Sequence, residues 1–286
     1  MSFFFRTFAP DFENQYPMRR IFSRSVFVAI VLLCAQLYAV PAFAWGQKGH
    51  RIIAKIAYDH LSRRARRNVD AVLGEQGMIY LANWADEIKS DTIYSNSYDW
   101  HFQDFPSGLT KQDIFSSRDR YPAEGGNMFR ALDSLNQEIL NHKSEINPHT
   151  LRFLIHLSGD LYCPMHMAHM DDRGGNDVHM KWFGCDTRLH TVWDERLIES
   201  QGYSYTEYAA KLEREYEASR KPLLGDQWSE KELIWNTYQL TEQIYAYQPV
   251  WDGNTYHYIY RWRQPMEYQL YVAGIRLAKL LNELYR

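Results

Sequence analysis

Residues 151–197 read LRFLIHLSGDLYCPMHMAHMDDRGGNDVHMKWFGCDTRLHTVWDERL. The residues of this stretch that could bind a metal are His156, Asp160, His166, His190 and Asp194. The first histidine and aspartate are four positions apart, and so are the last two. Because positions i and i+4 of a helix point the same way, each pair offers one imidazole and one carboxylate to a single point. These groups are ligands of zinc-like cations, and two such pairs around a further histidine predict a metal site.

The chain has 286 residues, of which 45% are hydrophobic and 15% aromatic. This composition suffices for one sizeable core and excludes a disordered chain. No long flexible linker, block of like charge or internal repeat divides the sequence, so a single domain is expected. The nine Trp and 21 Tyr could fill a core or offer stacking surfaces to bases or sugars, and their number alone leaves both open.

Residues 1–44 have the pattern of a signal peptide and do not belong to the fold. An apolar run, Val26–Val40, precedes a small-residue pattern that ends at Ala44, which predicts cleavage between Ala44 and Trp45. The basic residues before the run follow Met18, so translation could begin there. A membrane anchor is the alternative, but the run is short for a spanning helix. We therefore expect an exported protein, periplasmic or secreted, with no membrane anchor after cleavage and no stable protein partner.

The charge of the mature chain excludes one class of nucleic-acid-binding protein. Removing the four arginines and two acids of residues 1–44 leaves 28 basic and 33 acidic side chains, a net charge of −5. Proteins that grip a duplex through a basic face are not acidic in this way. A weak attraction for phosphate, focused at bound dications, fits this balance better.

Two cysteines, Cys163 and Cys185, remain after removal of the signal peptide. An oxidising compartment permits a disulfide between them. Either could instead be a buried free thiol, and both alternatives stay open. Nothing in the sequence makes them zinc ligands.

Hydrophobic periodicity predicts an all-α fold. The expected helices span residues 46–61, a basic segment between Ser62 and Gly74, 78–89, 127–142, a helix that Asn147 caps before Pro148, 206–220, 229–247 and 265–285. Asp86 lies on the third of them. Residues 99–106 should be loop or short extended chain, and residues 171–176 a turn. Alternation over residues 178–182 predicts a short strand, so at most a β-hairpin accompanies the helices.

Six motifs extend the ligand pattern over the mature chain: WGxxGH at the expected new terminus, WAD, WHF, HLSGDxxxPMH, DRGGN and LHTVWD. Their candidate ligands, in order, are Trp45, His50, Asp86, His101, His156, Asp160, His166, His190 and Asp194. In this order and context they resemble the trinuclear-zinc, single-strand-specific nucleases. That family includes nuclease S-one, nuclease P-one and plant bifunctional nucleases, and is related in fold to zinc phospholipase C. The resemblance implies a compact multi-helix domain over residues 45–286 and three Zn²⁺ ions per chain.

The resemblance also implies how the ligands divide among the metals. One zinc of a close pair would be held by Asp86, His101, His156 and Asp160. The other would be held by His50 with the α-amino group and carbonyl of Trp45, and Asp160 would bridge the two. A third zinc, a little apart, would be held by His166, His190 and Asp194.

Further residues are implied to act on the substrate. Phe102 matches a position that stacks on a nucleobase, and Asp104 one that hydrogen-bonds its edge. Lys89 stands where relatives carry an arginine near the phosphate, so it keeps the charge but not the two-pronged geometry. Asn176, in the DRGGN turn, would lie near the phosphate. With Lys89, the ligands Asp86 and Asp160 are counted as catalytic.

The implied reaction is hydrolysis of single-stranded DNA and RNA to 5′-phosphorylated products, together with 3′-nucleotidase activity. A close zinc pair lowers the pKa of a bridging water from 15.7 to about 7, so that hydroxide attacks phosphorus. Single-strand preference follows because a base stacks on Phe102 only when it is unpaired. A zinc phospholipase C is the alternative enzyme, and a non-catalytic zinc-binding protein is the alternative outside enzymes. A zinc pair with an open position argues against the latter.

Overall fold

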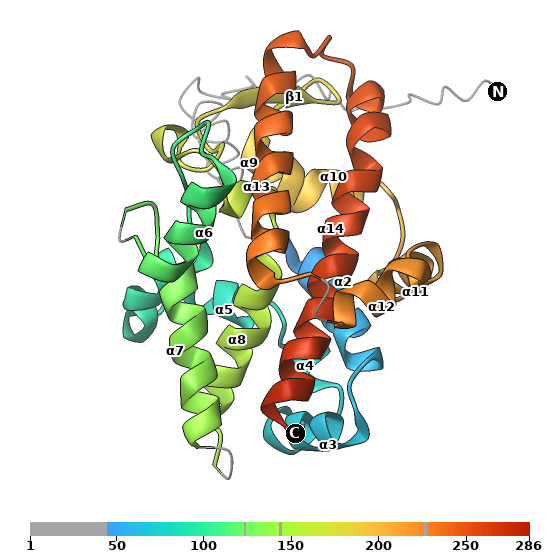
Figure 1. Ribbon diagram of the computed structural model, residues 1–286. Coiled ribbons are helices and arrows are strands. Elements are labelled where there is room, and N and C mark those ends of the chain that lie inside the picture. The colour runs from blue at the N-terminus through green and yellow to red at the C-terminus, as the bar shows by residue number, and fades with distance from the viewer. Residues whose placement is uncertain (1–44, 123, 143–144, 226–227) are drawn as a thin grey trace, which may run out of the picture. The chain divides into compact units, whose positions relative to one another are not determined.

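The computed structural model describes residues 45–286 except positions 123, 143–144 and 226–227. The predicted signal peptide and the possible start at Met18 lie outside the described residues. The described chain is a set of packed helices with one two-stranded sheet, which confirms the all-α prediction (Figure 1). Within this part of the chain no helix is both long enough and apolar enough to cross a membrane.

The first and last described helices pack together. Helix α2 (Gln47–Asp59) buries its isoleucines against α14 (Thr255–Leu284), and Gly274 of α14 lies against Ile53 and Ile56 (Figure 1). Helix α3 (Arg63–Leu73) follows, and the Ser62 side chain caps it by accepting from the backbone N–H of Ala65. Helix α11 (Tyr205–Glu215) packs on both α2 and α14, and α12 (Glu217–Leu224) packs on α14.

The second group of helices contains the predicted motif helix. Helix α8 (Pro148–Asp160) begins where predicted, with Asn147 capping the first turn and Pro148 at its first position. It packs against α7 (Met128–Asn141), as Figure 1 shows. Helices α6 (Lys111–Arg120) and α13 (Glu230–Tyr247) pack against each other. Most of α8 is buried, so its polar residues lie inside the protein.

The predicted single helix over residues 78–89 is wrong. The chain forms α4 (Gly77–Tyr80), a turn, α5 (Trp84–Glu87) and the 3-10 turn η1 (Ile88–Ser90). In an unbroken helix the carbonyl of Ala82 would accept from the N–H of Asp86. Here that N–H donates to Asn83, at 3.1 Å, and the Ala82 carbonyl accepts from His156 Nδ1 instead, at 2.7 Å. The helix is thus interrupted where the Ala82 carbonyl forms a hydrogen bond with a residue of α8, a helix distant in the sequence.

Other boundaries also differ from the prediction. The expected loop over residues 99–106 begins inside a 3-10 run, η2 (Thr92–His101), and only its later part is extended. The expected helix over residues 206–220 breaks at Tyr216, between α11 and α12. Helix α14 begins ten residues earlier than predicted and contains Pro265, because the turns before it bury Tyr258 and Trp262.

The segment after η3 (Pro164–His166) and η4 (Met170–Asp172) contains the predicted hairpin. Strands β1 (His179–Trp182) and β2 (Cys185–Arg188) pair antiparallel. A helical run follows, made of α9 (Leu189–Thr191), the π-helical η5 (Val192–Arg196) and α10 (Leu197–Glu199). A last 3-10 turn, η6 (Gln248–Val250), precedes α14. Cys163 is buried and Cys185 exposed, and both are free thiols in this structure, which favours the free-thiol alternative.

Candidate metal centre

Asp160, at the end of α8, is the centre of a buried group of side chains. Its Oδ1 lies 3.2 Å from His50 Nε2, and its Oδ2 lies 3.2 Å from His101 Nδ1 and 3.3 Å from His156 Nε2. Neither Asp160 nor His156 is exposed to solvent. The two carboxylate oxygens therefore face different imidazoles, as a bridging ligand would require.

Asp86 of α5 adds a second carboxylate to this group. Its Oδ1 lies 3.5 Å from His156 Nε2 and 3.7 Å from His101 Nδ1. The ligand atoms form two overlapping sets, one of His50, His156 and Asp160 and one of Asp86, His101 and His156. The two sets share His156, whereas the resemblance implies that Asp160 is shared, but both groupings separate His50 from Asp86 and His101. We call His50, Asp86, His101, His156 and Asp160 the Asp160 cluster.

A second cluster, the Asp194 cluster, contains His166, His190 and Asp194. His190 Nε2 lies 2.9 Å from Asp194 Oδ2, and His166 Nε2 lies 3.8 Å from Asp194 Oδ1. The Cys163 thiol donates a hydrogen bond to Asp194 Oδ1, at 3.3 Å. Burial raises the pKa of Cys163, which keeps its proton for this bond. All three ligand candidates are buried.

Backbone carbonyls orient the imidazoles of both clusters. His156 Nδ1 donates to Ala82, His190 Nδ1 to Gly174 at 2.6 Å, and His166 Nδ1 to the carbonyl of His101. A hydrogen bond at Nδ1 fixes the tautomer in which Nε2 carries a lone pair. In each ring Nε2 is therefore the nitrogen that faces the cluster, where a metal can take the place of its proton.

The unsatisfied polar atoms of the clusters fit a cation. Among the described residues, the buried side-chain atoms without a hydrogen-bond partner include His50 Nε2, Asp86 Oδ2, His156 Nε2, Asp160 Oδ1, His166 Nε2 and Asp194 Oδ2. A buried polar atom left without a partner costs about 1–3 kcal/mol, so such a concentration is unfavourable in a purely structural core. Imidazole nitrogen and carboxylate oxygen are the ligands that zinc takes. The residues present thus fit zinc.

The electrostatics of the Asp160 cluster favour added positive charge. Burial alone would lower the pKa of His156, but Asp160 and Asp86 outweigh it and raise that pKa to about 10. Burial lowers the pKa of His101 to about 4 and also lowers that of His50, so these imidazoles stay neutral with free lone pairs. The carboxylates therefore attract a cation, and neutral nitrogens surround the position it would take.

Trp45 lies between the two clusters. Its buried indole donates from Nε1 to the carbonyl of Gly159 in α8, at 3.1 Å. The next backbone N–H, of Gly46, donates to the carbonyl of Asp194 in η5, at 2.7 Å. The residue predicted to become the new terminus is thus held against both elements that carry the His/Asp pairs.

The predicted substrate residues lie around the clusters in different ways. Lys89 Nζ lies 2.6 Å from Asp86 Oδ1. Phe102 directly follows His101 and is half-buried. Asp104 is buried, its Oδ1 accepts from the backbone of Ala168, and burial raises its pKa to about 6. Asn176 donates from Nδ2 to the carbonyl of Arg173, within the turn.

The groups that orient the ligands were not predicted from the sequence. Gly174 supplies the carbonyl for His190 and has φ +64°, and a Cβ there would lie 2.8 Å from the Met165 carbonyl. Only glycine suits this position, which the DRGGN motif signals. The carbonyl of Ala82 and the thiol of Cys163 are set by tertiary contacts, and no local pattern marks them.

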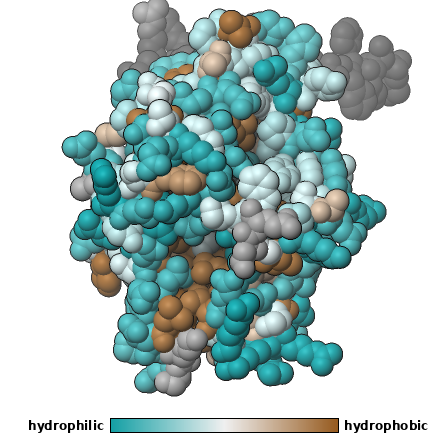
Figure 2. All heavy atoms as spheres, viewed as in Figure 1, coloured by the Kyte–Doolittle hydropathy of each residue, from teal (hydrophilic) through white to brown (hydrophobic). Residues whose placement is uncertain are grey.

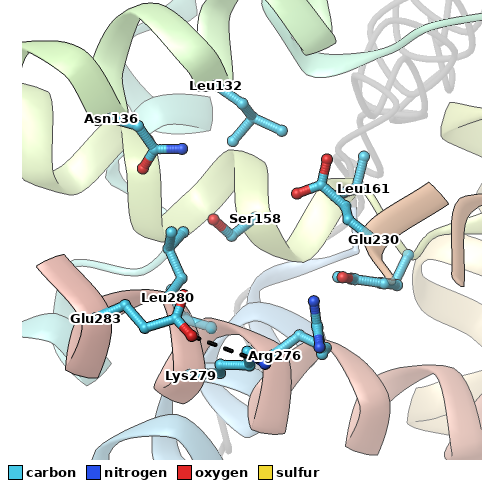
Figure 3. Close-up of a pocket in the computed structure, with 11 residues that line it drawn as sticks. Leu132, Asn136, Ser158, Leu161, Glu230, Arg276, Lys279, Leu280 and Glu283 are labelled. Carbon is cyan, nitrogen blue, oxygen red and sulfur yellow. Dashed lines mark ion pairs between the residues drawn. The ribbon is translucent and has the colours of Figure 1, made fainter. Parts of the chain in front are cut away.

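Two further features lie outside the clusters. His169, Asp171 and Asp172 form a partly exposed group, in which His169 already pairs with Glu242 and Asp172 accepts from Tyr245. A pocket of about 100 Å³ is lined from α7, α8, α13 and α14 (Figure 3). Figure 3 shows Ser158 of α8 facing it, across from the Lys279–Glu283 ion pair. No ligand candidate lines this pocket.

Comparisons with known proteins show to which family this chain belongs. The chain matches the S1/P1 Nuclease family over residues 45–286. It is 28% identical to Endonuclease 2 of Arabidopsis thaliana over 286 residues, which cover 90% of this chain and 97% of that protein. It is 27% identical to Nuclease S1 of Aspergillus oryzae over 236 residues, 80% of this chain and 79% of that protein. Nuclease P1 of Penicillium citrinum is 29% identical over 180 residues, 58% and 64% of the two chains. The chain therefore belongs to the S1/P1 nuclease family, whose members are hydrolases of phosphodiester bonds.

Proposed function

We propose that this protein is a zinc-dependent endonuclease that hydrolyses single-stranded DNA and RNA to 5′-phosphorylated products and removes the phosphate of 3′-nucleotides. The observation that carries the proposal is the set of buried, unsatisfied nitrogen and oxygen atoms around Asp160 and Asp194. The family match and the names of the relatives, which are nucleases and endonucleases, support a nucleic-acid substrate.

Three zincs are proposed, with the ligands divided as follows. The first is held by Asp86, His101, His156 and Asp160, the second by His50, Asp160 and the terminal amino group and carbonyl of Trp45, and the third by His166, His190 and Asp194. Bound zinc supplies Lewis acidity, which lowers the pKa of a water molecule and neutralises charge on the phosphate.

The protein's own residues hold this arrangement and orient the substrate. Asp160 keeps one oxygen toward His50 and the other toward His101, so it links two sets of ligands rather than one. Lys89 brings an ammonium group, partly exposed, next to Asp86, where it can attract the phosphate of the substrate. Asn176 is proposed to contact the same phosphate from the DRGGN turn. No side chain has to act as the nucleophile.

The base is proposed to bind at the segment that follows His101. Phe102 stacks on it, and Asp104 hydrogen-bonds its edge through Oδ2, because Oδ1 is already used by Ala168. Stacking needs an unpaired base, so this contact accounts for a preference for single strands.

Export is part of the proposal. Residues 1–44 are proposed to act as a signal peptide, with cleavage after Ala44 and a possible start at Met18. Cleavage would free the α-amino group of Trp45 and deliver the protein to the periplasm or the medium.

The decisive experiment compares two substrates. Purified protein starting at Trp45 should release acid-soluble nucleotides from single-stranded DNA and no phosphorylcholine from phosphatidylcholine. Elemental analysis should find close to three zincs per chain, and a chelator should abolish hydrolysis. The reverse substrate pattern would make the protein a phospholipase C, and a single zinc per chain would contradict the trinuclear site.

Phe102→Ala tests the base contact separately from the metals. Base–aromatic stacking is worth about 1–3 kcal/mol, so KM for single-stranded DNA should rise about fivefold to a hundredfold, with kcat changed little. Zinc content should stay at the wild-type value. Loss of zinc from this variant would show that Phe102 supports the metal ligands rather than the base.

A further inference from the structure

Tyr98 is a large aromatic side chain left in solvent beside the candidate centre. It is 65% exposed, while His101, three residues later on the same 3-10 run, is 1% exposed. The run η2 therefore leads from the surface at Tyr98 to the buried metal ligands at His101. An exposed aromatic side chain at such an entrance is a candidate contact for an unpaired base.

The ring of Tyr98 stands at right angles to the ring of Phe102. The ring centroids are 6.3 Å apart and the planes form an angle of 81°. Phe102 is itself fixed in place, because Gly126 passes so close that a Cβ there would lie 2.8 Å from the Phe102 ring. Two bases stacked on each other are parallel, so they could not both stack on these rings. The pair fits two neighbouring bases that are turned away from each other.

The backbone around Tyr98 is held firmly. Ser97 is buried and its hydroxyl donates to the carbonyl of Tyr94, at 2.8 Å. The carbonyl of Asp99 accepts from the backbone N–H of Asn127, at 2.8 Å, and the two side chains are also hydrogen-bonded. The exposed ring thus stands on an ordered support, which lowers the entropy lost when a ligand binds.

A cation, the guanidinium of Arg173, lies near Tyr98. Arg173, in the DRGGN turn, has a side chain that is 74% exposed and forms a two-pronged ion pair with Asp177, with N–O distances of 2.6 and 2.9 Å. The hydrogen bonds to Asp177 raise the pKa of Arg173, and the nearby Tyr98 adds to this effect. A phosphate that joins two bases bound at the rings would find positive charge beside it.

We propose that Tyr98 binds a second base, that of the nucleotide on the 5′ side of the one stacked on Phe102. The 5′ side is assigned because Tyr98 lies farther toward the surface than Phe102, and so away from the scissile phosphate at the metals. The proposal rests on the proposed function of the site. It makes Tyr98 a specificity residue that favours substrates of two or more nucleotides over mononucleotides.

The test compares two compounds that differ by one base. The first is thymidine 3′-phosphate, and the second is a two-base thymidine 3′-phosphate whose internal linkage is a methylphosphonate, which leaves the 3′-phosphate as the reacting group. Initial rates of phosphate release by the zinc-loaded protein give KM for both compounds, and dissociation constants are measured where no hydrolysis occurs. The wild type should bind the two-base compound about tenfold more tightly, equivalent to about 1.4 kcal/mol, within the range for stacking one base.

Three variants separate the outcomes. Tyr98→Ala should remove the advantage of the two-base compound and leave thymidine 3′-phosphate unaffected, while Tyr98→Phe should keep the advantage. Tyr260→Ala, which removes an 88% exposed tyrosine of α14, is the matched control and should behave like the wild type. The assignment of Tyr98 is overturned if Tyr98→Ala still binds the two-base compound more tightly than thymidine 3′-phosphate by the wild-type factor. It is also overturned if the wild type binds both compounds equally. A wild type that binds the compounds but hydrolyses neither them nor single-stranded DNA contradicts the proposed function instead.

Discussion

The Asp160 and Asp194 clusters use the same His/Asp spacing on two different backbones. His156 and Asp160 lie on the regular helix α8, at its buried C-terminal end. His190 and Asp194 lie on a run that changes from α-helix to π-helix at Val192. Both arrangements bring imidazole and carboxylate close together, with N–O distances of 3.3 and 2.9 Å.

The two clusters differ in what surrounds the shared pair. The Asp160 cluster adds ligand candidates from α2, α5 and η2, so four elements meet there. The Asp194 cluster adds His166 from η3, and its geometry depends on the Gly174 carbonyl and the Cys163 thiol. A π-helical turn is rare and often found at functional sites. One cluster is thus fixed by packed helices and the other by a turn and single hydrogen bonds.

The largest contrast is expected between Asp160→Asn and Asp194→Asn. Asp160 is proposed to hold two metals, so its amide variant should lose two zincs and all measurable activity. Asp194 is proposed to hold one metal, so its variant should lose one zinc and keep two. Elemental analysis after gel filtration measures this, with circular dichroism as the check that both variants fold. Equal zinc content in the two variants would remove the distinction between the clusters.

The next largest effect concerns the terminus. A version that keeps Ala44 before Trp45 replaces the α-amino group by an amide, which has no lone pair for a metal. A free α-amino group has a pKa of about 7.7–8.0, so zinc can displace its proton at neutral pH. The extended version should lack one zinc of the Asp160 cluster, keep the zinc at Asp194 and be nearly inactive. Three zincs and full activity in that version would make Trp45 an ordinary buried tryptophan.

The smallest effect is expected at Cys163. Cys163→Ala removes the hydrogen bond to Asp194 Oδ1 and should weaken zinc binding at the Asp194 cluster about tenfold, the lower end for loss of a group that orients a ligand. Cys163→Ser keeps a donor and should retain most of the affinity. Competition with a chelator measures both, and Cys185→Ala, at an exposed thiol, serves as control. Equal weakening by Ala and Ser would assign Cys163 to packing alone.

Much of this centre could be predicted because its signals are local. The spacing of His156 and Asp160 needs only the helix period, and the caps at Ser62 and Asn147 lie at the positions that the sequence predicts. The order of the motifs gave the family, which the match over residues 45–286 confirms. These inferences require no knowledge of which segments pack together.

The features that were missed depend on contacts between distant segments. The break between α4 and α5 leaves the carbonyl of Ala82 to accept a hydrogen bond from His156, which lies 74 positions later in the chain. Pro265 suggested a helix start, but burial of Tyr258 and Trp262 continues the helix through it, against a cost of about 3 kcal/mol for an interior proline. The state of the two cysteines followed from the burial of Cys163 against Asp194, which no spacing rule gives.

The packing of α2 on α14 has a consequence for the order of assembly. His50 lies on α2, the first described helix. The apolar face of α2 is buried against α14, the last described helix. The link is closed by the backbone N–H of Ser62 and the side chain of Asn282, 220 positions apart. Contacts of such sequence separation form slowly, and α14 is synthesised long after α2. The metal centre therefore gains its full support only after α14 has packed on α2, so metal acquisition belongs to a late stage of folding.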